Sequence, residues 1–397
     1  MSDLDPVIVA YARTPFGRLR GGLSSLPAVE LGAAAIRAAL DRAGLTPDQV
    51  EQCILGTVIT AGMGQVPARQ AALRAGIPSS VPSLSVNKVC ASSLKAINLA
   101  ALLIRSGDAE VVVAGGMESM SQAPMLLRGT RQGVAMGNLT MYDSMIWDGL
   151  TCPVDDVHMG EHGSAVAAEL GVSREEQDEF ALRSQQLYEQ ARRAGRIAEE
   201  IIPVEVPQRG GAVTVAGDEQ PRPDTTLEKL RGLRPVFGGP DGSVTAGNAP
   251  GINDGAAVVV MMSRRRAAEL NAEPLASWLG YGESAADHPY LATVPALALQ
   301  QALDRQGGAM TSQGLKLVEI NEAFASVVIT SSRMLELEAD RVNPNGGAIA
   351  IGHPIGASGA RILGALILEL RRRGGGLGGA TICSGLAQGE ATLVEVA

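Results

Sequence analysis

Cys90 is the residue of this chain whose type and position most favour covalent chemistry. A short apolar run over residues 83–86 leads into Asn87-Lys88-Val89-Cys90, and a helical pattern begins at Ala91. We therefore expect Cys90 where a buried strand becomes a helix, facing unpaired backbone N–H groups and the positive end of the helix dipole. Such surroundings favour the thiolate, the form that acts as a nucleophile. For a lone cysteine, a small buried residue at a crowded turn is the plainer interpretation.

Two further segments carry residues that could complete such a site. His353 lies in the glycine-dense stretch 345–361, just before a long helical pattern, and Cys383 ends an apolar run that starts at Ala380. Glycine lets the backbone approach a ligand closely, and loops on a rigid scaffold often carry functional residues. A thiol and an imidazole suit nucleophilic and acid–base catalysis. For Cys383 alone, packing at a strand end is the plainer interpretation.

Alternating strands and helices must position these residues. The first part of the chain predicts strands over 6–10, 52–57 and 111–116, and helices over 29–43, 67–75 and from Ala91. The last part repeats the pattern, with strands over 317–321 and 379–383 and helices over 323–335 and 357–373. This is βαβ architecture, and the recurring Ala-Ser at two helix starts indicates a duplicated unit. Two halves related by a pseudo-two-fold axis can bring Cys90 close to His353 and Cys383.

Residues 121–248 differ in composition from both halves. They include a polar helical pattern over 174–194 and a segment rich in Pro, Gly and charge over 203–241. Insertions of this length usually have a function. We interpret this one as a cover for the mouth of the site; the alternative is a surface insertion.

Composition excludes several classes of protein. With 397 residues, 46% of them hydrophobic, the chain can bury a large core in two or three domains. A net charge of −9 without a basic stripe argues against a nucleic-acid partner. No C-x-x-C spacing occurs, so neither disulfides nor a metal site are expected. We see no apolar run of membrane-spanning length, no signal peptide and no peroxisomal address, and expect a cytoplasmic protein.

Four segments, taken together, resemble the active-site blocks of thiolases, the acetyl-CoA C-acetyltransferase group. They are Asn87-Lys88-Val89-Cys90, Asn321-Glu322-Ala323-Phe324, Gly352-His353-Pro354 and Cys383-Ser384-Gly385. The resemblance extends, in order, over essentially the whole chain. It implies an α/β thiolase fold, in which duplicated βαβ-rich halves form a five-layer α-β-α-β-α sandwich with an inserted loop domain. The implied domains are an N-terminal half (1–120 plus 249–271), a CoA-binding loop domain (121–248) and a C-terminal half (272–397).

The resemblance also implies an acyltransferase that catalyses reversible Claisen condensation of two acetyl-CoA molecules to acetoacetyl-CoA and CoA. Cys90 would carry the acyl group, His353 would take the Cys90 proton, and Cys383 would deprotonate the second acetyl group. The backbone N–H groups of Cys90 and Gly385 would hold one oxyanion. His353 and a water on Asn321 would polarise the second thioester. An N-cap role for Asn321, on a helix beginning near residue 323, is the alternative.

Coenzyme A is the implied ligand, as substrate and product, with no further cofactor and no metal. By resemblance, the pantetheine arm is lined by His158, Met159, Ala249 and Phe324, and Arg222 lies near the nucleotide. Two departures affect chain-length preference. Pro250 stands where biosynthetic thiolases commonly carry Ser, and Leu386 stands where many relatives have glycine, which would narrow or reshape the pocket. The assembly implied is a homotetramer or homodimer.

Three alternatives to this acetyl-CoA acetyltransferase differ from it in substrate length, in reaction or in lacking activity. A degradative 3-ketoacyl-CoA thiolase would share every catalytic residue but accept longer acyl chains. A decarboxylating ketoacyl synthase uses one cysteine with His or Asn partners, so Cys383 argues against it. A catalytically silent acyl-CoA-binding relative would lack at least one catalytic position, whereas this chain has Cys90, His353, Cys383 and Asn321.

Overall fold

The first and last parts of the chain contribute strands to a single large sheet. The computed structural model describes residues 2–308 and 310–397. The strands of this sheet are β1 (Pro6–Arg13), β2 (Gly17–Arg18), β3 (Gln52–Gly56), β4 (Ser83–Val86), β5 (Val111–Ser119), β12 (Asn253–Ser263), β13 (Ala276–Ala285), β14 (Leu317–Ile320), β15 (Gly376–Ser384) and β16 (Gln388–Val396). Their order is β14-β15-β16-β13-β1-β12-β5-β3-β4, with β2 beside β12.

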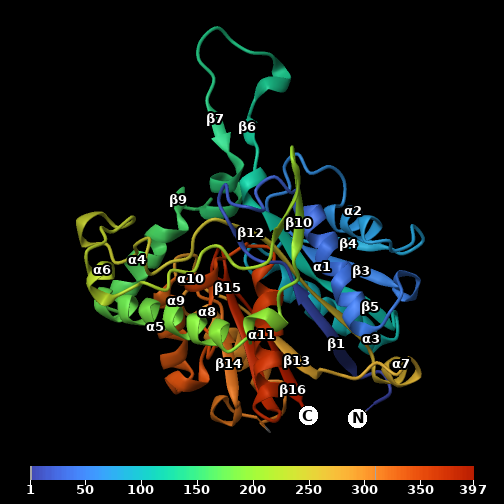
Figure 1. Cartoon of the computed structure of the whole chain (residues 1–397). Helices are drawn as coiled ribbons and strands as arrows, with labels where there is room; N and C mark the ends of the chain where they lie inside the picture. Colours follow the sequence, from blue (N-terminus) through green and yellow to red (C-terminus); the bar gives the residue numbers. More distant parts are fainter. Residues whose placement is uncertain (1, 309) are drawn as a thin grey trace.

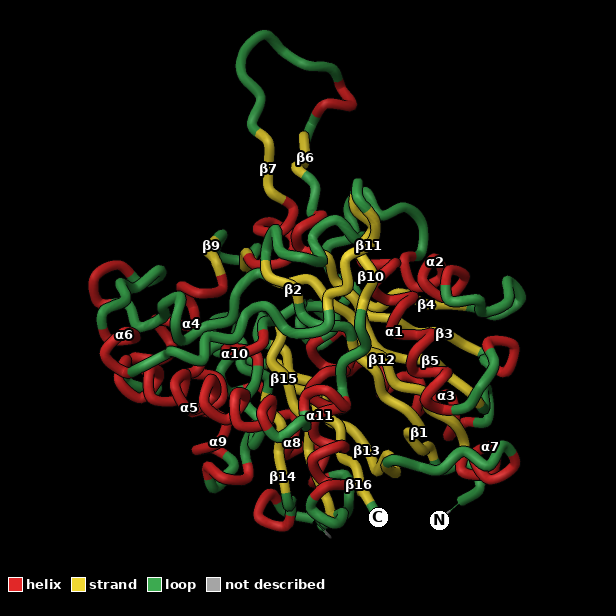
Figure 2. Tube along the Cα trace, viewed as in Figure 1, coloured by secondary structure: helices red, strands yellow, loops and turns green. Residues whose placement is uncertain are grey.

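Helices cover both faces of this sheet and separate its two halves (Figures 1 and 2). The helices are α1 (Ala28–Ala43), α2 (Pro67–Arg74), α3 (Ser92–Ser106), α7 (Arg264–Glu269), α8 (Val294–Asp304), α9 (Ala325–Met334), α10 (Ala348–Ile351) and α11 (Ser358–Arg372). One apolar core joins α1 and α2 to the N-terminal strands, a second surrounds α3 and α11, and a third joins α8 and α9 to the C-terminal strands. These are the five predicted layers.

The predicted duplication is present in the strand order. In the N-terminal half the order is β4-β3-β5-β12-β1, and in the C-terminal half it is β14-β15-β16-β13, with Val342 bridged to the outer side of β14. The pairs β3–β5 and β14–β15 are parallel, whereas β5–β12 and β15–β16 are antiparallel. The halves meet edge to edge through β1 and β13, which pair at Val7–Ser277 and Ile8–Ala276.

The segment between β5 and β12 forms its own small elements: β6 (Met125–Leu127), β7 (Met141–Asp143), β8 (Thr151–Cys152), β9 (Val157–His158), α4 (Met159–Glu169), α5 (Arg174–Arg193), β10 (Val204–Gln208), β11 (Gly211–Val215) and α6 (Leu227–Arg231). Its β6–β7 arm projects away from the body (Figure 1). Elsewhere the segment is tied down by Arg13 of β1, whose fully buried guanidinium pairs with Glu200 at 2.8 Å and Asp218 at 2.7 Å. The predicted domain boundaries stay a prediction.

Two expectations from the sequence are wrong here. The strand before Cys90 is not buried: β4 is the last strand of the sheet, and Leu84 is 49% exposed. An apolar stretch of membrane-spanning length does exist, over the 18 residues Val89–Ser106. It includes the whole of α3, whose apolar side packs in the core against α11, so its composition reflects its place between two layers.

Candidate active site

Cys90, His353 and Cys383 line one cavity between the two halves. Cys90 lies just before α3, His353 lies between α10 and α11, and Cys383 is near the end of β15. The chain separates Cys90 from Cys383 by almost 300 residues, yet charge on one thiol would raise the pKa of the other. The convergence expected from the pseudo-symmetry is therefore present. It comes from α3 and α11 packing side by side in the middle layer.

A strained turn presents Cys90 to the cavity. β4 ends at Val86, and Val89 has φ +45°, a conformation costly for a β-branched residue. Among the bonds that hold this turn, the side chain of Asn87 accepts from the N–H of Val89 at 3.0 Å, and Ser384 Oγ donates to the Lys88 carbonyl at 2.6 Å. The second bond attaches the Cys90 turn to the strand that carries Cys383.

The expected thiolate character of Cys90 is wrong for the ligand-free site. Burial raises the pKa of Cys90 to about 12, although the N–H groups of Cys90 and Gly385 oppose this rise. Desolvation of the charged form exceeds the stabilisation by the helix start and the two N–H groups. Cys90 is therefore a thiol at neutral pH and needs a base to remove its proton as it attacks.

His353 has the protonation state and tautomer of such a base. Burial, reinforced by the Arg361 charge, lowers the pKa of His353 to about 3, so the ring is neutral at pH 7. Its Nδ1 contacts Ser358 Oγ, which itself donates to the Pro354 carbonyl at 2.9 Å. Because that hydroxyl proton is used, Oγ accepts from Nδ1–H. Nε2 then carries the lone pair, and this buried atom has no partner among the described residues.

The backbone around His353 is fixed by residues of the other half. Asn253 of β12 accepts from the N–H of His353 at 2.9 Å, and Glu118 of β5 accepts from the N–H of Gly356 at 3.0 Å. Gly352 has φ +105°, and a Cβ there would lie 2.4 Å from the Asn253 side chain. Burial raises the pKa of Glu118 to about 7. Sequence reasoning assigned no role to Asn253, Glu118 or Ser358, because their contacts join distant segments or depend on the local backbone of the folded chain.

Cys383 and Asn321 are both buried, with different surroundings. Burial, and then the Cys90 charge, raises the pKa of Cys383 well above its ordinary value. Asn321 is fully buried, and neither its side-chain oxygen nor its nitrogen has a partner among the described residues. The N-cap alternative for Asn321 is wrong, because α9 begins at Ala325 after Phe324 and has no side-chain cap. Such an unpaired amide is suited to holding a water or a polar ligand group.

The residues expected to contact CoA divide into two groups. His158, Met159, Ala249 and Phe324 line the cavity, whose walls are mostly apolar. His158 stacks on Phe237 at 4.4 Å between ring centroids, and its Nδ1 accepts from the N–H of Gly160, which caps α4. Arg222 does not line the cavity. It is exposed, with its guanidinium 3.5 Å from the carbonyl of Ala246, a cavity residue.

The two departures from the thiolase pattern have different positions. Pro250 lines the cavity, as expected for a residue that affects substrate fit. Leu386 does not line it: the residue has φ +59° and is 37% exposed, whereas its neighbour Gly385 reaches the cavity wall. The expectation that Leu386 narrows the pocket is therefore wrong, because the turn after β15 directs this residue outward.

The chain matches two family models, "Thiolase, N-terminal domain" over residues 6–265 and "Thiolase, C-terminal domain" over residues 272–396. It is 50% identical over 392 residues to an acetyl-CoA acetyltransferase of Cupriavidus necator, covering 98% of this chain and 99% of that protein. Identity to a Pseudomonas aeruginosa acetyl-CoA acetyltransferase is 50% over 388 residues, 98% of each chain. The crystal structure of the Bacillus anthracis acetyl-CoA acetyltransferase superposes with a TM-score of 0.96, at 39% identity and 99% coverage of both chains. The fold expected from the resemblance is confirmed.

Proposed function

The chain belongs to the thiolase family, and on that premise we propose that it catalyses reversible Claisen condensation of two acetyl-CoA molecules to acetoacetyl-CoA and CoA. The enzyme is an acyltransferase. The observation that carries this proposal is the meeting of two thiols and one neutral imidazole in one apolar cavity. Acyl transfer followed by carbon–carbon bond formation needs a nucleophile, a base for each half-reaction, and donors for the oxyanions.

In the first half-reaction, Cys90 Sγ attacks the thioester carbon of one acetyl-CoA while His353 Nε2 takes the thiol proton. The tetrahedral oxyanion accepts hydrogen bonds from the N–H groups of Cys90 and Gly385. When it collapses, the carbon–sulfur bond to CoA breaks and His353 returns the proton to the leaving CoA thiolate. The raised pKa of Cys90 supports this order, because proton removal has to accompany attack. The product is acetyl-Cys90 and free CoA.

In the second half-reaction, Cys383 first gives its thiol proton to His353 Nε2 and then, as the thiolate, takes a proton from the methyl carbon of a second acetyl-CoA. The resulting enolate oxygen accepts hydrogen bonds from the protonated Nε2 of His353 and from a water on Asn321. The carbanion attacks the carbonyl carbon of acetyl-Cys90, and Cys90 leaves as the thiolate, which recovers a proton from His353 Nε2. The raised pKa of Cys383 supports a strong base once its proton is removed, and the unpaired amide of Asn321 supports the water position.

Coenzyme A enters beside His158, Met159, Ala249 and Phe324, with its nucleotide toward Arg222. Apolar walls suit the pantetheine arm, and the exposed guanidinium of Arg222 suits phosphate at the mouth. No cofactor beyond CoA itself takes part in these steps.

A degradative thiolase of broad chain length remains the second candidate, because Pro250 removes a hydroxyl from the cavity wall. The test is thiolysis of 3-ketoacyl-CoA esters of increasing length by CoA, followed by chromatography of the acyl-CoA products. Fastest cleavage of acetoacetyl-CoA supports the first proposal, and equal or faster cleavage of longer esters supports the second. If none of these esters is cleaved, both are wrong, and a silent acyl-CoA-binding protein is favoured.

We also propose a homotetramer or homodimer in the cytoplasm. Strand β4 ends the described sheet with a free edge and an exposed Leu84, a surface suited to pairing with a second copy. The β6–β7 arm exposes Met125, Met136 and Met141, each at least 60% exposed. Sedimentation of the full chain at two concentrations tests the assembly, and a monomer at both would overturn it.

A further inference from the structure

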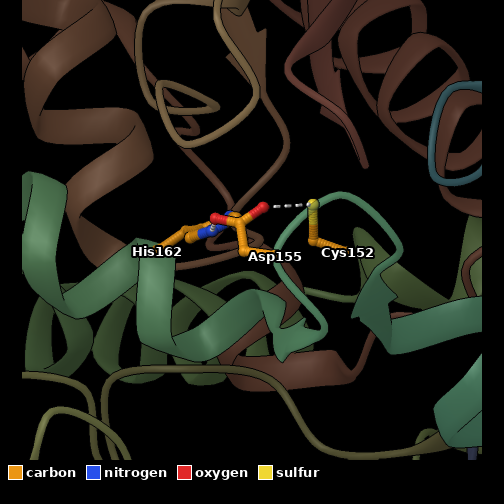
Figure 3. Close-up of side chains that lie close together, drawn as sticks. All are labelled: Cys152, Asp155 and His162. Carbon is orange, nitrogen blue, oxygen red and sulfur yellow. Dashed lines mark hydrogen bonds and ion pairs between the residues drawn. The ribbon is translucent and has the colours of Figure 1, made fainter.

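Four side chains with metal-binding atoms converge outside the catalytic cavity. Cys152 ends β8, Asp155 lies in the turn before β9, and His162 lies in the first turn of α4, as Figure 3 shows. His288 reaches them from the loop after β13. Asp155 is central: its Oδ1 is 3.4 Å from Cys152 Sγ and 2.9 Å from His288 Nε2, and its Oδ2 is 2.9 Å from His162 Nε2.

The separations suit a small cation with a short coordination radius. The ligand atoms of Cys152, Asp155 and His162 all lie within 4.8 Å of one another. Zinc bonds of roughly 2.0–2.3 Å in a tetrahedron put neighbouring ligand atoms about 3 to 4 Å apart. A small movement of the Asp155 carboxylate away from the centre would therefore open the required position. Asp155 and His288 are each about a third exposed, so an ion has a path from solvent.

The chemistry of the donors distinguishes this cluster from an ordinary ion pair. One thiol, two imidazoles and one carboxylate are ligand types that zinc prefers, and four of them complete its coordination. A carboxylate accepting from two imidazoles explains the His162 and His288 contacts alone. The buried thiol of Cys152 donates a hydrogen bond to the same carboxylate at 3.4 Å, so a third metal-binding atom faces it. A shared cation explains why the ligand atoms of Cys152, Asp155 and His162 lie within 4.8 Å of one another, and His288 completes the set through its contact with Asp155.

We propose that Cys152, Asp155, His162 and His288 form a binding site for one divalent zinc ion per chain. The ion would join the β8–β9 hairpin and α4 of the inserted segment to the loop 286–291 of the C-terminal half. His158 and Met159 on the first side, and Leu291 on the second, line the catalytic cavity. The site is thus a structural clamp on one cavity wall and touches no reacting atom. It departs from the sequence expectation, which considered only cysteine spacing.

Cobalt titration of the full, metal-stripped chain tests the proposal. The chain carries Cys90→Ala and Cys383→Ala, so that the catalytic thiols bind no cobalt. We expect one equivalent of Co²⁺ to give a sulfur-to-cobalt charge-transfer band and the intense visible bands of a tetrahedral site, both abolished by one equivalent of Zn²⁺. Zinc should also raise the melting temperature. Absence of binding, or binding without the charge-transfer band, overturns the proposal.

Ligand variants locate the ion. In that background, Cys152→Ser should abolish the charge-transfer band, and Asp155→Asn and His288→Gln should lower the cobalt affinity. Cys53→Ala is the matched control, since Cys53 is a buried thiol of β3 far from the cluster in the fold, and the band should survive it. If Cys152→Ser does not fold, the cobalt affinity of Asp155→Asn, a change at a partly exposed residue, still tests whether the ion binds at this cluster. A spectrum unchanged by Asp155→Asn and His288→Gln overturns the assignment.

Discussion

Two junctions between the halves have equivalent positions in the duplicated topology but different chemistry. At the first, Cys383 near the end of β15 shares a cavity with Cys90, just ahead of α3. At the second, Glu118 near the end of β5 accepts a hydrogen bond from the N–H of Gly356, just ahead of α11. We call these the reactive junction and the structural junction.

The register of the sheet establishes the equivalence. Glu118 pairs with a glycine of β12, and Cys383 pairs with a glycine of β16, Gly255 and Gly389 respectively. Cys90 and Gly356 each lie two residues before the first residue of a 15-residue central helix. One arrangement of strand end and helix start thus supports two outcomes. The thiol pair provides reactivity, whereas the carboxylate satisfies backbone N–H groups and holds the loop that carries His353.

The largest effect should come from removing the nucleophile of the reactive junction. Cys90→Ala should lower kcat by on the order of 10⁴-fold or more, because no other group can carry the acyl chain. Thiolysis of acetoacetyl-CoA measures this. Cys53→Ala is the control, a buried thiol whose loss leaves the cavity intact. Comparable rates for Cys90→Ala and the parent would contradict the proposed chemistry.

Cys383→Ala should separate the two half-reactions. Turnover should fall by roughly 10² to 10⁴-fold, the usual contribution of a general base. Acetyl-Cys90 should still form, because acylation uses His353 and not Cys383. Intact-mass measurement after mixing with acetyl-CoA should find one added acetyl group per chain. An unmodified chain would mean that Cys383 takes part in acylation too.

Ser358→Ala tests how the tautomer of His353 is set. Without the hydroxyl, the buried Nδ1–H loses its acceptor, at about 1 to 3 kcal/mol, or roughly 5- to 150-fold in rate. We expect kcat to fall while KM stays near its parent value, and Ser358→Thr to restore activity. Equal kcat for Ser358→Ala and the parent would show that the tautomer is fixed in another way.

Breaking the structural junction should change the pH dependence of stability. The pKa of Glu118 is raised to about 7 in the folded chain, above the value near 4.5 of an exposed carboxyl. Its contribution is therefore fully present below pH 4.5 and is lost as pH rises through about 7. Glu118→Gln should lower the free energy of unfolding by about 1 to 3 kcal/mol, since N–H groups lose an acceptor.

The same variant should flatten the decline in stability between pH 4.5 and 7. Urea unfolding at several pH values measures both effects. A parallel pH profile for parent and variant would mean that Glu118 does not titrate in this range.

The smallest effect should come from the cavity wall beside the reactive junction. Pro250→Ser supplies a hydroxyl that can bond a pantetheine amide, worth about 0.5 to 1.5 kcal/mol. We expect KM for CoA in thiolysis to fall roughly 2- to 13-fold. The outward-facing Leu386 provides the comparison, and Leu386→Gly should leave KM unchanged. The reverse pattern would place Leu386 in the substrate path.

The reactive junction could be predicted from sequence, but the structural junction could not. Cys90, His353 and Cys383 lie in short sequence blocks whose thiols and imidazole indicate nucleophilic and acid–base catalysis. The residue types around Glu118 do not indicate its role, because its contact with Gly356 joins residues 238 apart in the chain. The same applies to His288, which contacts Asp155 from the C-terminal half. Sequence patterns reveal local periodicity, whereas these contacts arise only when two halves pack.

Errors in the prediction have a common physical origin. The position of Cys90 at a helix start predicts a thiolate, but desolvation has the larger effect on its pKa. A capping role for Asn321 requires a helix that begins near residue 323, whereas α9 begins two residues later. In both cases the local effect exists, but packing around the residue determines the pKa of Cys90 and the start of the helix after Asn321.

The apolar character of α3 has a consequence for how the protein is made. Its buried partner α11 begins at Ser358, 252 residues after α3 ends at Ser106. At the usual pace of translation, roughly 13 to 50 seconds pass before that partner leaves the ribosome. Throughout this interval the face of α3 that packs on α11 lacks its partner, although β3 and β5 can already cover the opposite face of this apolar segment. A chaperone that shields this segment on the ribosome would therefore raise the yield of correctly assembled enzyme.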